Sequence, residues 1–464
     1  MKLLLIFSLI FSLVIASGCA GQKTKKSSKG ADDLIHFDVV ERTLDNGLKV
    51  LVVENSKLPL VSYYTYFDVG GKFETKGLTG ASHFLEHMMF KGAKKYPEGV
   101  FDQTVEGNGG RNNAFTTSDM TVYYESLPSE HIEKIIDVEA DRMQNLALNP
   151  KPFESEKQVV LEERKMRYEN SDRGKLYMEM MKNVFKGTPY GTPVIGWIKD
   201  IKEVSRDQVF DYFKRYYAPN NAFVVIVGDV DADKTVKMME KAFGDIPRSD
   251  DLKEKKKEAI EENGKFDFKG SYDGRWVKVN GTSNDPMFML AFKGMKIGPR
   301  TSYVLDILSS MLGDGESSYL NGQYVLSRRP QLANIYAANY TLQESGVFFV
   351  GGQLLKDTNL NTLRKSLYGR ITKGCLSSLT QRQLQKVKNQ YLVSYLNGLD
   401  TNEGVARFIG DRQAYYGDYE HYKEEMDVYN SITLEEVTKA CDQFLRKENS
   451  IFISIWNKHP KDKK

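Results

Sequence analysis

Two of the six histidines in this chain lie four residues apart, with a glutamate between them. His83, Glu86 and His87 form the order His-x-x-Glu-His. In a helix, positions i and i+4 lie on one face, one turn apart, and Glu86 shares that face. Two imidazoles and a carboxylate so arranged can bind a divalent metal ion and place a general base beside it. The order is typical of the inverted zincins, so the sequence predicts a zinc site built for hydrolysis.

A zinc site that keeps one position open needs a third protein ligand, which we expect to be a carboxylate from another helix. Residues 153–166 are a helix-compatible segment that offers four glutamates. Glu156 and Glu163 are seven residues apart and share a face, whereas Glu162 points about 100° away from Glu163. Glu154 is the fourth candidate. Helical periodicity alone leaves the choice among them open.

Length and composition limit the class of protein. A chain of 464 residues exceeds one hydrophobic core, so we expect more than one domain. The hydrophobic share of 41% and charged share of 27% are ordinary for a globular protein. A net charge of +3 is nearly neutral at this size and argues against binding to nucleic acid.

The first residues are typical of a secretory signal. Met1-Lys2 precedes an apolar run from Leu3 to Ala16, too short for a membrane span. Ala16-Ser17-Gly18-Cys19 resembles a bacterial lipobox, which implies a signal peptide over 1–18 and lipidation of Cys19. Residues 19–33 are then a flexible tether. Ala20 after the cysteine favours the outer membrane, with the protein facing the periplasm. The alternative is a plain cleaved signal with an incidental cysteine.

Only Cys375 and Cys441 remain behind Cys19, which is too few for a metal site made of cysteines. In an oxidising compartment the two could form a disulfide, and the sequence does not decide this. We expect two buried free thiols.

The pattern of predicted elements occurs twice. Each half is predicted to begin with strands, continue through helices and end on an apolar strand, at 222–227 and at 451–456. Phe115 to Leu127 is predicted as a single strand. Charged residues fill 248–264, which we interpret as a linker or solvated face. The predicted domains are a metal-binding domain over 34–247 and a homologous domain without the metal motif over 265–464.

Further motifs follow the histidine pair in order. They are Asn113-Ala-Phe-Thr116, Glu139-Ala-Asp-Arg-Met143, Val160-Leu-Glu-Glu163, Pro193-Val-Ile-Gly196 and Tyr217-Ala-Pro-Asn-Asn221. Together they resemble the pitrilysin and insulinase family of zinc peptidases, in the short two-domain branch related to the mitochondrial processing peptidase. The resemblance implies an α+β fold of two homologous domains, each a mostly antiparallel sheet with helices packed on it, joined by the charged linker.

The resemblance also assigns roles to residues of the site. It implies one Zn²⁺ per chain held by His83, His87 and Glu163, with Glu86 as general base and Glu156 assisting catalysis. Asn113 and Ala114 match the strand along which the family aligns an extended peptide by main-chain hydrogen bonds. The implied function is that of a zinc endopeptidase that hydrolyses extended peptides or unfolded polypeptides in the bacterial cell envelope.

One departure from the family concerns the second half. Family members that act alone have an Arg and a Tyr there that grip the substrate, and Tyr319 and Asn334 occupy the matching positions. We therefore expect a catalytic subunit of a heterodimer, whose homologous partner lacks the zinc motif but supplies these contacts. Arg328 or Arg329 could compensate instead, which would allow a homodimer.

The alternative from another class is a non-catalytic peptide-binding or scaffold subunit of an envelope complex. Such a subunit has no use for a general base beside the metal. The presence of Glu86 with the complete ligand set therefore favours the enzyme.

Overall fold

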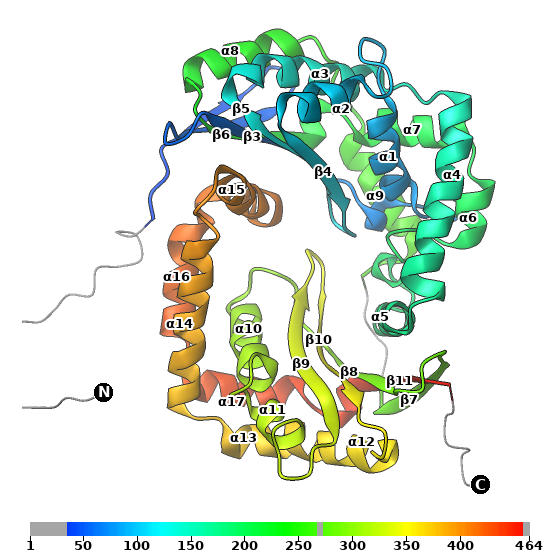
Figure 1. Cartoon of the computed structure of the whole chain (residues 1–464), viewed down its shortest axis with the longest axis vertical. Helices are drawn as coiled ribbons and strands as arrows, with labels where there is room; N and C mark the ends of the chain where they lie inside the picture. The colour runs from blue at the N-terminus through cyan, green and yellow to red at the C-terminus, as the bar shows by residue number, and fades with distance from the viewer. Residues whose placement is uncertain (1–34, 267–271, 458–464) are drawn as a thin grey trace, which may run out of the picture. The chain divides into compact units, whose positions relative to one another are not determined.

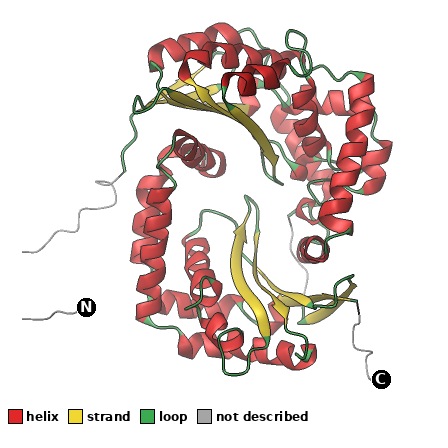
Figure 2. Cartoon of the chain, viewed as in Figure 1, coloured by secondary structure: helices red, strands yellow, loops and turns green. Residues whose placement is uncertain are grey.

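The computed structural model describes residues 35–266 and 272–457. From Phe37 onward the chain forms one compact unit, which contains two β-sheets and the helices packed on them (Figures 1 and 2). The signal peptide, the tether and Cys19 that the sequence predicts lie outside the described residues. Among the helices in the described ranges, none combines the length and the apolar character needed to cross a bilayer.

The first sheet has six strands in the order β1-β2-β6-β3-β5-β4. Its centre is the apolar strand β6, which is almost fully buried, parallel to β2 and antiparallel to β3. Strands β1 and β2 form a hairpin that turns at Gly47, whose φ of 94° suits glycine. The strands are β1 (Val39–Thr43), β2 (Lys49–Glu54), β3 (Leu60–Phe67), β4 (Arg111–Thr116), β5 (Thr121–Pro128) and β6 (Ala222–Gly228).

The prediction of a single strand over Phe115 to Leu127 is wrong. The segment instead spans the turn between β4 and β5, which pair with each other in antiparallel fashion. The hydroxyl oxygen of Thr117 accepts hydrogen bonds from the backbone N–H groups of Asp119 and Met120, at 3.1 and 3.0 Å. A threonine side chain that satisfies local backbone donors stabilises a turn. The turn makes β4 the edge strand of the sheet.

The second sheet repeats this topology with five strands in the order β7-β11-β8-β10-β9. Strand β11, the last in the sequence, is parallel to β7 and antiparallel to β8, as β6 is to β2 and β3. The predicted α+β fold of two similar halves is therefore confirmed, although the sequence did not predict β7. The strands are β7 (Arg275–Asn280), β8 (Met287–Lys293), β9 (Leu332–Thr341), β10 (Gly346–Leu354) and β11 (Ser450–Trp456).

Helices cover the sheets and carry the site. Those of the first half are α1 (Ala81–Met88), α2 (Val100–Val105), α3 (Ile132–Asn145), α4 (Pro150–Arg164), α5 (Asp172–Val184), α6 (Ile198–Glu203), α7 (Arg206–Tyr216), α8 (Ala232–Phe243) and α9 (Leu252–Asn263). Those of the second half are α10 (Arg300–Gly313), α11 (Tyr319–Tyr324), α12 (Leu360–Tyr368), α13 (Cys375–Ser378), α14 (Gln381–Asn397), α15 (Asn402–Tyr416), α16 (Tyr422–Ser431) and α17 (Leu434–Phe444).

The segment predicted as a charged linker contains helix α9. Ala259 is buried in the core of the first half, with Leu252 and Ile260 packed beside it. Lys256 donates hydrogen bonds to the side chains of Asp68 and Asn221, at 2.5 and 2.6 Å. The face with Leu252, Ala259 and Ile260 therefore docks on the first half, and Lys256 on that face bonds to it.

Each half contributes one helix that packs on the sheet of the other half. Helix α5 of the first half packs on β8 and β11 of the second sheet, where Met180 lies among Met289 and Ile453. Helix α15 of the second half packs on β3 and β6 of the first sheet (Figure 1). Gly410 of α15 permits this contact, because a Cβ atom there would lie 2.3 Å from the Tyr66 ring. The exchange buries apolar area from both halves and holds them together.

The expectation of two free thiols is wrong, because Cys375 and Cys441 form a disulfide. The bond joins α13 to α17, and both cysteines are buried in the core of the second half. Sixty-six residues separate them in the sequence, so only the tertiary fold brings them together.

We expect the disulfide to stabilise the protein chiefly by restricting the unfolded chain. For a loop of this length, the loop-entropy relation gives about 4 kcal/mol. Replacing both cysteines, Cys375→Ser with Cys441→Ser, should lower the free energy of unfolding in denaturant by about this amount. Two thiols that react with a thiol reagent in the denatured, unreduced wild-type protein would contradict the pairing.

Candidate metal centre

Helix α1 carries the histidine pair and begins in an unusual way. The Glu74 carboxylate accepts hydrogen bonds from the backbone N–H groups of Gly80 and Ser82, at 2.6 and 2.8 Å. It thereby satisfies donors at the helix N-terminus, where a negative charge is favourable. His83 and His87 lie one turn apart with ring centroids separated by 4.7 Å. The predicted helix and its shared face are confirmed.

Helix α4 packs against α1 and supplies the third candidate ligand. The rings of Phe84 and Phe153 contact edge to face, with centroids 4.9 Å apart. Glu163 Oε2 lies 3.6 Å from His83 Nε2 and 3.3 Å from His87 Nε2. One ligand atom from each of these three residues lies within 4.8 Å of the other two.

Two other glutamates of α4, Glu154 and Glu162, pair with lysines of the same helix region. Glu154 pairs with Lys157, and the exposed Glu162 pairs with Lys165. Within residues 35–266 and 272–457, no second group of three potential ligands was found. The structure thus selects Glu163 from the candidates that periodicity left open.

A zinc ion fits this group. Glu163 Oε2 is buried and has no hydrogen-bond partner in the described structure, although it faces two imidazole nitrogens. The other oxygen, Oε1, pairs with Arg167 at 2.9 Å. Two imidazole nitrogens and one carboxylate oxygen are a known ligand set for zinc with an open position. A bound cation would give this buried oxygen the partner that no hydrogen bond of the described structure supplies.

Glu156 touches a ligand of the site. Its Oε1 lies 3.0 Å from His87 Nδ1, and its Oε2 lies 3.1 Å from Lys91 Nζ. Burial opposes ionisation, but the hydrogen bonds from His87 and Lys91 hold the pKa of Glu156 below its usual range. A carboxylate at Nδ1 places the proton there and leaves Nε2 free to bind a metal. This geometry suits orientation of the histidine.

The two histidines differ in their preferred charge. Burial, together with the charge on His87, lowers the pKa of His83 to about 4. Burial alone would also lower the pKa of His87, but the hydrogen bond with Glu156 and the negative charge of Glu163 raise it to about 9. Without a metal, the positive charge of protonated His87 therefore balances the negative charges of Glu156 and Glu163. Metal binding must displace that proton, so the affinity for metal will fall in acid.

Glu86 lies beside the ligands without belonging to their group. The Thr116 hydroxyl donates to Glu86 Oε2 at 2.5 Å, from the last residue of β4. Burial raises the pKa of Glu86, and this hydrogen bond offsets part of the effect. A carboxylate with a raised pKa near an open metal position is suited to move a proton.

The edge strand β4 borders the site. Among the described residues, no strand pairs with its outer edge. Asn113 and Ala114 of β4, together with the histidine pair and Glu86, line a groove of about 980 Å³. The structure thus brings the predicted strand to the metal ligands.

Tyr319 and Asn334 lie outside this groove. Tyr319 starts α11 and is only 9% exposed, within the core of the second half. Asn334 is exposed on β9, near Gln353. Sequence reasoning did not single out Thr116, Arg167 or Glu74. Arg167 follows Glu163 at i+4, a spacing that could have identified it.

Neutralising Glu163 should abolish metal binding. Glu163→Gln removes the charged ligand, so we expect less than one-tenth of the wild-type zinc content by elemental analysis after dialysis. Glu154→Gln is the matched control, because its side chain is exposed, pairs with Lys157 and does not line the groove. Equal zinc content in the wild type and Glu163→Gln would contradict the assignment.

Glu74 should make stability depend on pH. Burial raises its pKa from 4.5 to about 7, and the two backbone hydrogen bonds only partly offset this. Folding therefore favours the protonated form. The resulting stability is full below pH 4.5 and is lost as the pH rises to about 7, by on the order of 3 kcal/mol.

Replacing the Glu74 carboxyl group should weaken the dependence of the free energy of unfolding on pH in this range. Between pH 4.5 and 7, the free energy of unfolding of Glu74→Gln should decline less than that of the wild type, as measured in denaturant at a series of pH values. Identical slopes for the two proteins would show that Glu74 is not the group responsible.

Two family models match successive parts of the chain. The model described as insulinase, peptidase family M16, matches residues 49–196. The model described as the peptidase M16 inactive domain matches residues 203–391. The first contains both histidines and Glu163. The second agrees with the absence of a metal group from the described part of the second half.

Relatives and solved structures cover most of the chain. The zinc protease PqqE of Helicobacter pylori is 29% identical over 378 residues, which are 80% of this chain and 82% of that protein. The mitochondrial-processing peptidase subunit beta of Dictyostelium discoideum is 25% identical over 418 residues, 87% of this chain and 86% of that one. A crystal structure of a protease from Helicobacter pylori, 26% identical, matches with a TM-score of 0.81 over 90% of this chain and 99% of its own. The chain therefore belongs to the insulinase family, peptidase family M16, and is a zinc protease of that family.

Proposed function

We propose that this protein is an endopeptidase that cuts extended peptides or unfolded polypeptides in the bacterial cell envelope. The observation that carries the proposal is the placement of His83, His87 and Glu163 beside the open edge of β4, with Glu86 in the same groove. An open strand edge next to a hydrolytic centre suits a chain with free main-chain groups, and folded proteins offer few of these.

The side chains divide the chemical work. Zinc held by His83, His87 and Glu163 supplies Lewis-acid chemistry, which polarises a carbonyl group and lowers the pKa of water. The Thr116 hydroxyl donates a hydrogen bond to Glu86 Oε2. The other carboxylate oxygen, Oε1, is therefore the one that exchanges a proton. Glu86 takes a proton from the attacking water and delivers it to the departing amine. Glu156 assists indirectly by fixing the tautomer and the orientation of His87.

Substrate alignment falls to β4. Asn113 and Ala114 lie in this strand, whose outer edge pairs with no other strand among the described residues. Main-chain pairing holds a peptide in register and largely ignores its side chains. The scissile bond is then fixed relative to Glu86 by the Thr116 hydroxyl, which belongs to the same strand. This coupling explains how broad recognition is compatible with a defined cleavage point.

Two features support a location outside the cytoplasm. The sequence of residues 1–19 favours export and a lipid anchor at Cys19, with the protein on the outer membrane facing the periplasm. The disulfide between Cys375 and Cys441 suits an oxidising compartment, because cytosolic thiols are kept reduced.

We further propose a homologous partner. Tyr319 is buried and Asn334 lies outside the groove, so neither can grip a peptide at the metal. The relative from Dictyostelium is named as a subunit, which agrees with an enzyme whose metal site and substrate grip lie on different subunits. A partner without the zinc motif would supply the grip in a heterodimer, and a homodimer is the other arrangement. Full activity of the purified single chain at low concentration would remove the need for a partner.

Glu86 provides the test of catalysis. We expect Glu86→Gln to bind one zinc per chain but to lose roughly a hundredfold to ten-thousandfold in kcat on a flexible peptide, because the amide does not accept the proton. Glu154→Gln should retain wild-type kcat, because Glu154 does not line the groove. A chelator should abolish cleavage, and zinc should restore it. Undiminished cleavage by Glu86→Gln would exclude its role as the base.

The anchor is tested by fractionation of cells. Cys19→Ala should release the protein from the outer-membrane fraction into the soluble periplasmic fraction, because the lipidated residue is removed. Ser28→Ala, in the predicted tether, serves as the control and should leave the membrane fraction unchanged. Membrane association that persists in Cys19→Ala would contradict the lipid anchor.

A further inference from the structure

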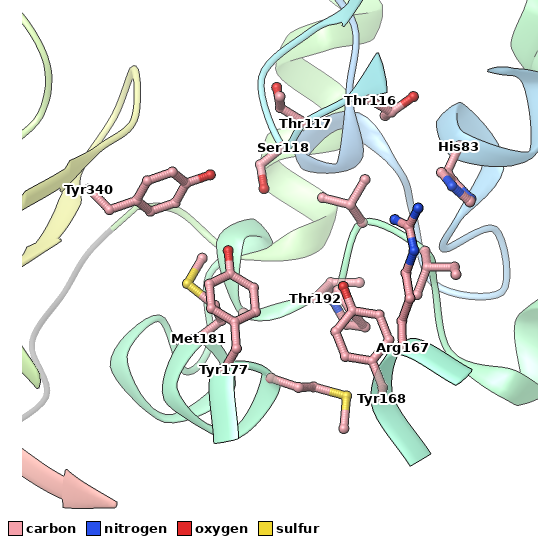
Figure 3. A pocket seen from close by; sticks show the side chains of 15 residues that line it. His83, Thr116, Thr117, Ser118, Arg167, Tyr168, Tyr177, Met181, Thr192 and Tyr340 are labelled. Carbon is pink, nitrogen blue, oxygen red and sulfur yellow. The ribbon is translucent and has the colours of Figure 1, made fainter. Parts of the chain in front are cut away.

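Arg167 lies at the boundary between the metal ligands and a small pocket. The pocket has a volume of about 210 Å³ and is lined by residues of both halves, among them His83 and, from β9, Tyr340. Arg167 lines this pocket and also the larger groove along β4. Figure 3 shows its guanidinium group pointing from the pocket wall toward His83. The cation therefore lies where the ligands, the pocket and the groove meet.

A π-helical turn, η6 (Lys165–Glu169), follows α4 and carries Arg167. Its wider hydrogen bonding is seen at Asn170, whose backbone N–H donates to the carbonyl of Lys165, five residues earlier, at 2.8 Å. Single π-helical turns inside helices are frequent at functional sites. Glu163 and Arg167 are four residues apart across the start of this turn, so their side chains are neighbours on one face. The local structure thus places the guanidinium group beside the carboxylate of Glu163.

The two carboxylate oxygens of Glu163 have different neighbours. Oε2 faces the Nε2 atoms of His83 and His87, at 3.6 and 3.3 Å. Oε1 forms an ion pair with Nη2 of Arg167, at 2.9 Å. Burial raises the pKa of Glu163, but the neighbouring His87, His83 and Arg167 hold it below its usual range, so the carboxylate is charged. One oxygen is thus available to a metal ion, while the other is held by a cation.

No other carboxylate competes for Arg167 in residues 35–266 and 272–457, where Glu163 is its one ion-pair partner. The Arg167 side chain is 65% exposed, whereas that of Glu163 is 15% exposed. A guanidinium group has five N–H donors, and those not directed at Glu163 are open to water in the groove. Because the single partner of this arginine is a metal ligand, its effect on the site passes through that ligand.

The pairing has a consequence for metal binding. A carboxylate can bind a metal ion through one oxygen or through both. A zinc site for hydrolysis has three protein ligands and keeps one position open. If Glu163 bound through both oxygens, the second oxygen would crowd that position. Arg167 opposes this, because its charge engages Oε1. Glu156 has a comparable task at His87, where it orients a different ligand.

We propose that Arg167 is a positioning residue that limits Glu163 to one metal-binding oxygen and so keeps the metal centre open to water and substrate. Arg167 acts through the carboxylate with which it pairs, and not by contact with the substrate. The inference rests on the zinc site and does not depend on which polypeptides the enzyme cuts.

Visible absorption of bound Co²⁺ tests the number of ligands. Four-coordinate Co²⁺ absorbs visible light more strongly than Co²⁺ with five or six ligands. With one equivalent of Co²⁺, the wild type should give the intense spectrum of a four-coordinate site. Arg167→Met should give the weaker spectrum of a five-coordinate site, because both oxygens of Glu163 can then bind. Arg167→Lys keeps a cation at this position and should retain most of the wild-type spectrum.

Metal affinity and turnover distinguish this role from a merely structural one. Arg167→Met removes a positive charge next to the metal and frees an oxygen ligand, so it should bind zinc at least as tightly as the wild type, measured by competition with a chromophoric chelator. Its kcat on a flexible peptide should nevertheless fall by roughly tenfold to a hundredfold, while KM changes by less than about threefold.

Lys165→Met is the matched control. Lys165 lies in the same π-helical turn, pairs with Glu162 and lines neither the pocket nor the groove. Its replacement should leave the Co²⁺ spectrum, the zinc affinity and kcat unchanged.

The outcomes separate this proposal from the proposed function. A five-coordinate spectrum already in the wild type, or a four-coordinate spectrum in Arg167→Met, would overturn the positioning role. A rise in KM at constant kcat would also overturn it, because Arg167 would then be a substrate contact. Wild-type protein that gives the four-coordinate spectrum but cuts no flexible peptide would overturn the proposed function and leave the role of Arg167 to be decided by the spectra.

Discussion

A buried carboxylate oxygen without a hydrogen-bond donor is unfavourable unless a cation contacts it, and Glu163 Oε2 is such an atom. Two imidazole nitrogens face it, and the surroundings hold it there. Arg167 binds the other carboxylate oxygen, and Glu156 fixes the ring of His87. The packing of α1 against α4 brings these two imidazole nitrogens and one carboxylate oxygen close enough for a single metal ion to contact all three.

The two halves share one topology but do different work. The first half supplies the ligands, the base and the aligning edge of β4. The second half supplies helix α15, which covers the first sheet, and the wall that Tyr340 forms beside the metal. In return, α5 covers the second sheet. Each sheet therefore needs a helix of the other half to cover its apolar face. For this reason the second half, which has no metal ligands among its described residues, still stabilises the half that carries the site.

Local patterns in the sequence were sufficient for some features. The four-residue spacing of His83 and His87 determined their shared face, and the repeated strand pattern indicated two similar halves. Glu163 needed the resemblance to a family, because periodicity treats Glu156 and Glu163 alike. The remaining features depend on contacts between distant residues. The turn that separates β4 from β5, the pairing of Cys375 with Cys441 and the approach of Tyr340 are set by tertiary structure, and no local pattern encodes them.

Zinc K-edge X-ray absorption of the protein loaded with one equivalent of metal tests the central claim most directly. We expect a low-coordinate site with two imidazole ligands and oxygen donors at about 2.0–2.2 Å, and no sulfur. In Glu163→Gln, this first coordination shell should be lost or rearranged. A sulfur contribution, a six-coordinate spectrum like that of zinc in water, or a shell that Glu163→Gln leaves unaltered would contradict the account.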